Sequence, residues 1–150
     1  MGKNEIIYRL KTSTANDIRF HLEECNNNFL PPLNEKVNIN EYAKKIFEKA
    51  ITFEAWKEKT LIGLIAAYFN NTSSSVFITN VSVTKKHMGS GVASQLLHNC
   101  IEYARHKRFN EIQLEVGCEN IQAQNFYKKH NFIHCDIKKD TMIRKLELNK

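Results

Sequence analysis

Two glycines spaced as Gly89-x-Gly91 lie where the sequence passes from a β-branched segment into a long amphipathic one. A glycine turn that opens a helix leaves several backbone N–H groups without partners, and the helix dipole adds about half a positive charge there. Such a turn binds phosphate groups. Lys85, Lys86 and His87 precede the turn and add cationic side chains. The segment therefore predicts a site for a ligand that carries several negative charges.

The two glycines match the common nucleotide-binding motifs less well. A Rossmann interpretation would use Gly89-x-Gly91-x-x-Ser94, with Glu111 or Glu115 as the acidic residue about 20 positions on. Too few residues follow to complete such a sheet, and a basic segment separates the strand from the first glycine. No Gly-Lys-Ser/Thr sequence is present, which excludes a P-loop NTPase. A plain strand-to-helix turn without a ligand remains the alternative.

The cysteines and histidines do not have the spacing of a metal site. Reduced thiols packed as small hydrophobic residues are expected at all four cysteines, which are Cys25, Cys100, Cys118 and Cys135. Most of the histidines are expected in solvent; they are His21, His87, His98, His106, His130 and His134. The sequence therefore predicts no metal site.

The glycine turn needs a sheet and helices to position it, and the hydrophobic pattern supplies both. Strands are predicted over residues 5–10, 51–56, 61–69, 76–83, 111–116, 132–137 and 142–148. Helices are predicted after Thr14, after a cap at Asn40, after Gly91, and from Asn120 through Lys129. The prolines and asparagines of residues 26–33 predict a loop. This order indicates one mixed sheet of the α/β or α+β class, with an antiparallel meander in its middle.

The composition places the chain among ordinary globular domains. Its 150 residues are 42% hydrophobic, enough for a single domain over residues 1–150. No apolar run approaches the ~20 residues of a membrane span, and the first residues lack a signal-peptide core, so a cytoplasmic protein is expected. The net charge of +6 invites a nucleic-acid hypothesis, but the basic residues are interleaved with acidic ones. A small anionic ligand explains the charge equally well.

Two motifs in this order resemble the GNAT superfamily of acyl-CoA-dependent N-acyltransferases. The first is the family's pyrophosphate loop, [Gln/Arg]-x-x-Gly-x-[Gly/Ala], which corresponds to Lys86-His-Met-Gly89-Ser-Gly91 after the strand Val81-Ser-Val83. The second is Asn-x-x-Ala-x-x-x-Tyr followed by Gly-Phe, which corresponds to Asn120 through Phe132 with Tyr127 at the tyrosine. Lys86 replaces a planar Gln or Arg, and Asn131 replaces the glycine. Neither change removes a backbone donor.

The resemblance implies a fold and a set of cofactor contacts. The family's mixed, mostly antiparallel sheet is flanked by helices and splayed between its fourth and fifth strands, where the pantetheine of the acyl-CoA lies. Backbone groups of Val81 and Val83 would then pair with pantetheine, and Asn120 would contact the cofactor. Tyr127 would contact the cofactor too and act as the general acid that protonates the leaving thiolate. The pyrophosphate contacts implied by the loop are Lys86, Met88, Gly89, Ser90, Gly91, Val92 and Ala93.

The general base is less well indicated by the sequence. Some family members carry a Glu on the strand before the pyrophosphate loop, but residues 76–83 hold no carboxylate. Glu115 on the next strand, Glu54, and a water relay through Asn80 and Ser82 are the candidates. An acceptor of low pKa would need no dedicated base.

The acceptor site is expected where the family builds it. The loop between the first two helices, residues 26–40, is expected to shape specificity through Phe29, and Asn80 is a candidate substrate-binding residue.

The chain is accordingly identified as a member of this superfamily that uses acetyl-CoA and no metal. The expected reaction is acetyl transfer to a primary amine of a small molecule, such as a polyamine-like amine, an amino sugar or a nucleotide-linked amino sugar. A protein N-terminus or lysine as acceptor, a longer acyl chain, and a non-catalytic CoA-binding module of the same fold remain open. A homodimer is compatible with the sequence, although no motif indicates one.

Overall fold

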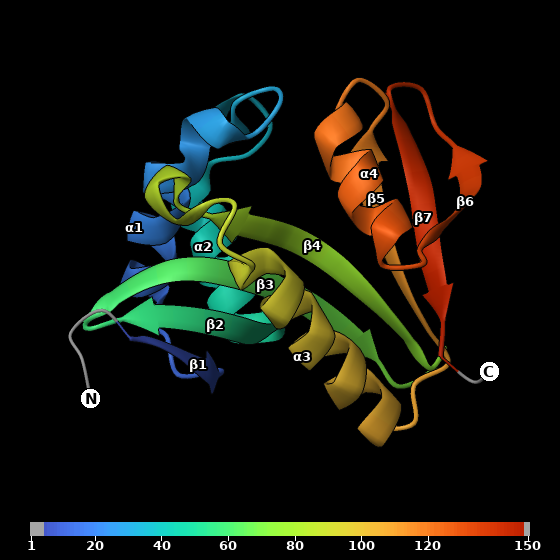
Figure 1. Ribbon diagram of the computed structural model, residues 1–150, viewed down its shortest axis with the longest axis horizontal. Helices are drawn as coiled ribbons and strands as arrows, with labels where there is room; N and C mark the ends of the chain where they lie inside the picture. The colour runs from blue at the N-terminus through green and yellow to red at the C-terminus, as the bar shows by residue number, and fades with distance from the viewer. Residues whose placement is uncertain (1–4, 149–150) are drawn as a thin grey trace.

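A computed structural model describes residues 5–148 and places them in one seven-stranded sheet with helices on both faces (Figure 1). The strands are β1 (Ile6–Leu10), β2 (Ile51–Lys57), β3 (Thr60–Asn70), β4 (Ser75–Val83), β5 (Glu111–Gly117), β6 (Ile133–Ile137) and β7 (Thr141–Glu147). The helices are α1 (Ala15–Cys25), α2 (Ile39–Lys49), α3 (Val92–His106) and α4 (Ile121–Lys129). The predicted element order is confirmed.

The sheet has the order β1-β2-β3-β4-β5-β7-β6, and β4 with β5 is its one parallel pair in the described chain. That pairing covers only four residues, from Ser75 opposite Glu111 to Ile78 opposite Leu114. Both strands then continue without pairing to each other, and Figure 1 shows them diverging. The mostly antiparallel sheet and the splay between its fourth and fifth strands are therefore confirmed.

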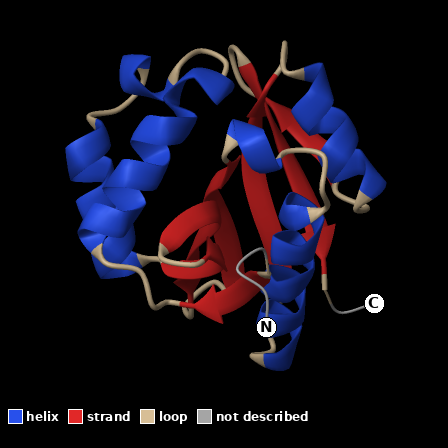
Figure 2. Ribbon diagram, turned by 60° about the vertical axis from the view of Figure 1, so that its left-hand side comes forward, coloured by secondary structure: helices blue, strands red, loops and turns tan. Residues whose placement is uncertain are grey.

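The helices form two layers, one on each side of the sheet (Figure 2). The amphipathic face of α3 packs Val92, Leu96 and Leu97 into the larger core, which also includes Tyr127 of α4. The opposite face of the sheet packs against Ile18 and Leu22 of α1 and against α2. The central strand β3 contributes to both cores, which explains its nearly unbroken apolar sequence.

Two details of the predicted elements are corrected. The second helix is capped by Asn38, whose side chain accepts the N–H of Glu41 at 3.0 Å, so Asn40 lies inside the first turn. The 26–33 loop begins with a short 3₁₀ helix at Asn26–Asn28, and a second one, Leu33–Glu35, starts at its last residue, after the two prolines. The first helix begins as expected, because Thr14 and Asp17 form a capping box.

The cysteines agree with part of the expectation from the sequence. The four cysteines form no disulfide, and Cys25 and Cys100 are buried as expected. Cys135 is exposed, at a bulge of the edge strand β6, so the prediction of a packed thiol is wrong there. Within residues 5–148 no cluster of His, Cys, Asp and Glu could hold a metal ion, and no helix is long and apolar enough to cross a membrane.

Candidate active site

A cleft of about 730 Å³ occupies the space where β4 and β5 separate. Its walls come from the loop before α2, the second half of β4, the glycine turn, the end of β5, and α4. Of the predicted site residues, the cleft is lined by Phe29, Asn80, Val81, Val83, Met88, Gly89, Gly91, Val92, Ala93, Glu115, Asn120 and Tyr127. Lys86 and Ser90 are exposed and do not line it. Twelve of fourteen predicted positions thus surround one cavity.

The glycine turn closes one end of the cleft. Gly89 and Gly91 adopt φ values of +77° and +86°, in the left-handed region, and Gly91 is the N-cap of α3. A Cβ at either position would meet no atom within 4 Å, so the backbone conformation, and not space, requires glycine here. The first N–H groups of α3 lack helical acceptors and lie at the cleft. This geometry suits an anionic group.

His87 adds a polar group beside the turn. Its Nδ1 lies 2.8 Å from Thr84 Oγ1, while its Nε2 is buried and has no partner in the described chain. Burial, together with the charges of Lys57 and Lys86, lowers the pKa of His87. The ring is therefore neutral at pH 7, and it can donate or accept one hydrogen bond at the turn.

The other wall of the cleft is α4, which carries Tyr127. Asn120 caps this helix by accepting the N–H of Ala123 at 3.1 Å. Tyr127 is buried against the rings of Phe126 and Phe132, and burial raises the pKa of its phenol. No group in residues 5–148 hydrogen-bonds to this hydroxyl, which leaves it available to a ligand in the cleft. A phenol in this state is a proton donor at neutral pH.

Other side chains of the protein bind the two carboxylates that the sequence offers as candidate general bases. Glu115 lines the cleft, but its Oε2 lies 3.3 Å from Nζ of Lys138 on the solvent side. Glu54 does not line the cleft and is fully buried, and its oxygens accept hydrogen bonds from the four residues Thr12, Ser13, Thr52 and Trp56. Burial alone would raise the pKa of Glu54, yet these donors hold it below the usual value. Glu54 is therefore a structural anchor for the β1–α1 connection.

A buried histidine, which the sequence pattern did not single out, stands behind the cleft. His21 is only 3% exposed, contrary to the expectation of solvated histidines, and its Nε2 lies 2.9 Å from Ser82 Oγ. Ser82 Oγ lies 2.8 Å from Asn80 Oδ1, and both of these β4 residues line the cleft. Two signals in the sequence point to this arrangement: the alternation that puts residues 80 and 82 on one face, and the place of His21 beside Leu22 on the apolar face of α1.

The loop of residues 26–40 and α2 form another part of the cleft wall. Phe29, Leu30 and Pro31 line it, and Asn28 Nδ2 donates to Val83 O at 3.4 Å. From α2, the hydroxyl of Tyr42 donates to Thr79 O at 2.8 Å and fixes that helix to β4. The loop that was expected to shape specificity thus borders the cleft.

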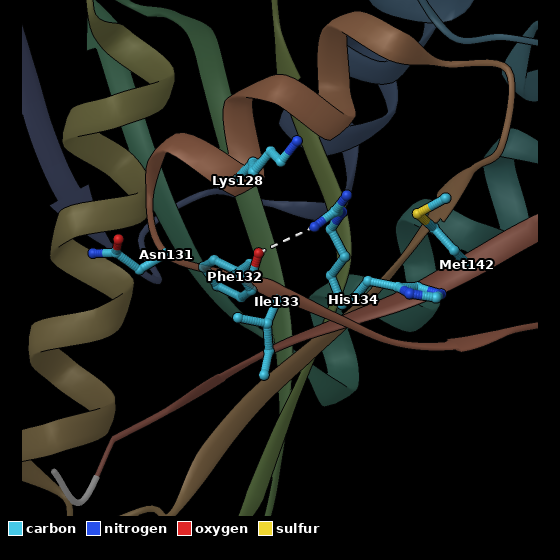
Figure 3. Close-up of a pocket in the computed structure, with 7 residues that line it drawn as sticks. Lys128, Asn131, Phe132, Ile133, His134 and Met142 are labelled. Carbon is cyan, nitrogen blue, oxygen red and sulfur yellow. Dashed lines mark hydrogen bonds between the residues drawn. The ribbon is translucent and has the colours of Figure 1, made fainter.

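A second pocket, of about 610 Å³, shares no lining residue with the cleft (Figure 3). Its buried Arg144 donates through Nη1 to Phe132 O at 3.2 Å, and its Nε has no partner in the described chain. Lys128 and His134 lie on the same pocket. We assign Arg144 a structural part, because it ties the turn after α4 to β7.

Comparison with known proteins adds family information to this geometry. The profile of the Acetyltransferase (GNAT) family matches residues 16–132. Streptothricin acetyltransferase A of Bacillus subtilis (strain 168) is 35% identical over 86 residues, which are 57% of this chain and 49% of that protein. The chain thus matches about half the length of this curated relative.

Solved structures share the fold over nearly the whole chain. The ribosomal-protein-S18-alanine N-acetyltransferase of Escherichia coli superposes with a TM-score of 0.80 at 15% identity, covering 97% of this chain and 96% of that one. The PaiA N-acetyltransferase of Thermoplasma acidophilum, solved in complex with coenzyme A, superposes with a TM-score of 0.75 at 15% identity, covering 95% and 99%. At these identities the likeness concerns the fold.

Proposed function

Because the chain belongs to the acetyltransferase (GNAT) family, we propose that it transfers an acetyl group from acetyl-CoA to a primary amine of a small molecule. The observation that carries this proposal is the cleft between β4 and β5, which has a glycine turn at one end and the Tyr127 hydroxyl in its wall. Acetyl-CoA supplies an activated acyl group as a thioester.

The residues of the cleft fit an acyl-CoA. Beyond Ile78 the β4 edge that faces β5 is no longer paired with it, so backbone groups of Val81 and Val83 can bind the amides of pantetheine. The N–H groups from Gly89 through Ala93 can bind the pyrophosphate, while the N–H of Met88 donates to Lys85 O at 3.3 Å. Asn120 can contact the pantetheine part of the cofactor. Lys86 adds a charge near the phosphates from the protein surface.

The same chain supplies two groups to the reaction. The N–H of Val81 stabilises negative charge that develops on the acetyl oxygen as the amine attacks. Burial raises the pKa of Tyr127, so the phenol holds its proton at neutral pH and donates it to the sulfur as negative charge develops there. Glu115 is a weaker candidate for the base, since Lys138 binds its carboxylate.

Small amines are the favoured acceptors, with Phe29 and Asn80 as binding residues. Streptothricin is the first acceptor to test, because of the 35% identical relative, and amino sugars and nucleotide-linked amino sugars follow. Lys36 lines the cleft from the same loop as Phe29 and suits an acceptor that also carries negative charge.

The test combines binding and turnover. At 100 times the dissociation constant, acetyl-CoA should raise the free energy of unfolding by about 2.7 kcal/mol, as measured by thermal or denaturant unfolding. The Gly89→Glu, Gly91→Glu double variant should lose this gain, whereas a Ser73→Glu control in the exposed β3–β4 turn should keep it. Release of free thiol with an amine panel should then identify the acceptor.

Two results would contradict the proposal. If acetyl-CoA gives no stabilisation, the chain does not bind the donor. If it binds without acetylating any amine in the panel, a non-catalytic CoA-binding module becomes the better description.

A further inference from the structure

Three polar side chains form a line from the interior of α1 to the cleft. His21 Nε2 lies 2.9 Å from Ser82 Oγ, and Ser82 Oγ lies 2.8 Å from Asn80 Oδ1. All three residues are less than 9% exposed, but Ser82 and Asn80 line the cleft while His21 lies behind them. The line therefore connects a buried imidazole to the cleft.

The protons of this line can be counted. His21 Nδ1 lies 3.0 Å from Leu61 O, a carbonyl that can only accept, so Nδ1 carries the ring proton. A neutral ring then presents a lone pair at Nε2. The Ser82 hydroxyl has one proton, but it has acceptors on both sides, Nε2 of His21 and Oδ1 of Asn80. When the Ser82 hydroxyl donates to Asn80 Oδ1, the thiol of Cys25, whose Sγ lies 3.7 Å from Nε2, is the group that can donate to this nitrogen.

The neutral state of His21 is the stable one at neutral pH. Burial lowers the pKa of His21 to about 4, although its contacts at Leu61 and Ser82 act in the opposite direction. The ionisable group in contact with the ring is Cys25, whose Sγ lies 3.7 Å from Nε2. Burial and the charge of Glu24 raise the pKa of this thiol to about 12, so it brings no charge.

We infer that Ser82 and His21 accept the proton of the attacking amine, with Ser82 as the group that touches the amine and His21 as the final acceptor. This inference rests on the proposed function and names the base that the carboxylates do not supply. Ser82 then donates its hydroxyl proton to Asn80 Oδ1, and the newly protonated His21 Nε2 donates to Ser82 Oγ.

The proton transfer balances. As the amine nitrogen bonds to the acetyl carbon, its proton passes to Ser82 Oγ and the original Ser82 proton passes to His21 Nε2. The carbon–sulfur bond breaks, and Tyr127 gives its proton to the sulfur. After the products leave, the extra proton of His21 returns through Ser82 and solvent, and Tyr127 is reprotonated. One proton has moved from nitrogen to sulfur, with no oxidation or reduction.

Three variants test the relay. Ser82→Ala removes the first acceptor and should lower kcat about 100-fold or more, with unchanged stabilisation by acetyl-CoA. His21→Gln keeps an amide oxygen that can accept the Ser82 hydroxyl but cannot take up a proton, so it should lose a similar factor. The exposed His98 on α3 provides the matched control His98→Gln, which should retain wild-type kcat.

The pH dependence of kcat distinguishes a chemical role of Ser82 and His21 from a structural one. In both relay variants kcat should recover about tenfold per pH unit towards alkaline pH, because hydroxide replaces the missing acceptor. Full activity of His21→Gln with a loss in Ser82→Ala would overturn the part of His21 as proton acceptor and leave it as a residue that orients Ser82. Wild-type kcat in both variants would overturn the relay while the transferase function stands.

The tautomer and the protonation state of His21 can be measured without turnover. Nitrogen NMR of the wild-type protein should show His21 as the Nδ1–H tautomer and neutral at pH 6. An Nε2–H tautomer would overturn the relay, whatever the activity of the variants. A protein that binds acetyl-CoA but acetylates no amine would contradict both the relay and the proposed function.

Discussion

At the scale of single residues, the protein contacts of Tyr127 are made by its ring and not by its hydroxyl. The ring packs against Phe126 and Phe132, whereas the hydroxyl has no hydrogen-bond partner within residues 5–148. Ring burial therefore supplies the stability of this side chain, and the hydroxyl is free for a ligand. Stability and activity should respond differently when the oxygen is removed.

Tyr127→Phe should lower kcat about 100-fold, because the leaving sulfur loses its proton donor. The free energy of unfolding should change by less than about 1 kcal/mol, since no protein hydrogen bond is lost. Parallel measurement of kcat and urea unfolding checks both statements. Equal kcat in the variant would remove Tyr127 from the reaction, and Phe20→Ala on the exposed face of α1 serves as a control.

His21 links stability to pH in a defined window. Its pKa is about 4 in the folded state and 6.5 in the reference state, so the unfolded chain binds more protons between these values. The contribution of His21 to the free energy of unfolding is therefore fully present above about pH 6.5. It is lost as the pH falls towards 4, by up to about 3 kcal/mol. Urea unfolding of wild type and His21→Gln across this range should show a shallower pH dependence in the variant. Identical slopes would contradict a neutral buried His21.

At the scale of elements, the start of α3 is held unusually close to the sheet. A Cβ at Gly63 on β3 would lie 2.8 Å from Val92 Cγ1 and 3.1 Å from Leu96 Cδ1. Val92 is the first residue of α3, directly after the glycine turn. The absence of a side chain at position 63 therefore helps to set the position of the helix end whose N–H groups face the cleft.

Gly63→Ala should destabilise the fold by about 1–3 kcal/mol, because the added methyl group forces Val92 and the start of α3 outward. The dissociation constant for acetyl-CoA should increase with it. Gly117→Ala is a suitable stability control, because its nearest atoms would lie at 3.9 Å. Unfolding and calorimetric titration measure the two effects, and an unchanged affinity would separate α3 packing from cofactor binding.

At the scale of the whole molecule, the sheet consists of two parts joined by the short β4–β5 ladder. The β1–β4 part carries α1, α2 and α3, while the β5–β7 part carries α4 (Figure 1). Ligand binding in the cleft would bridge the unpaired ends of these parts.

Amide hydrogen exchange should therefore slow on addition of acetyl-CoA at residues 81–83 and 115–117, where the strands gain a partner. Residues 75–78, which are already paired with β5, should change much less. Exchange measured by mass spectrometry with and without acetyl-CoA tests this difference. Uniform slowing along β4 would indicate global stabilisation without binding in the cleft.

The local features were predictable and the long-range ones were not. The glycine turn, the helix that follows it and the Asn120 cap are read from neighbouring residues, and the structure confirms them. The contact of His21 with Ser82 joins residues 61 positions apart, and the cluster around Glu54 joins β2 to the segment before α1. Local patterns place His21 and Ser82 on the apolar faces of their own elements, but they do not say that these two residues pair. Asn38 and Asn40 both have capping side chains, and only the geometry decides between them.

Any rotation of the two parts of the sheet relative to each other would take place about the four-residue ladder between β4 and β5. A strand rises about 3.3 Å per residue, so Thr79 lies ~3 Å beyond the last pair at Ile78, and Val83 lies ~16 Å beyond it. A rotation of about 5° around the ladder would then move the strands by ~0.3 Å at Thr79 and ~1.4 Å at Val83. Asn80 and Ser82 lie closer to the pivot than the glycine turn does. At Ser82, four residues beyond the last pair, the same rotation would move the strand by ~1.2 Å, so the reacting end and the phosphate end of the cleft would widen almost equally.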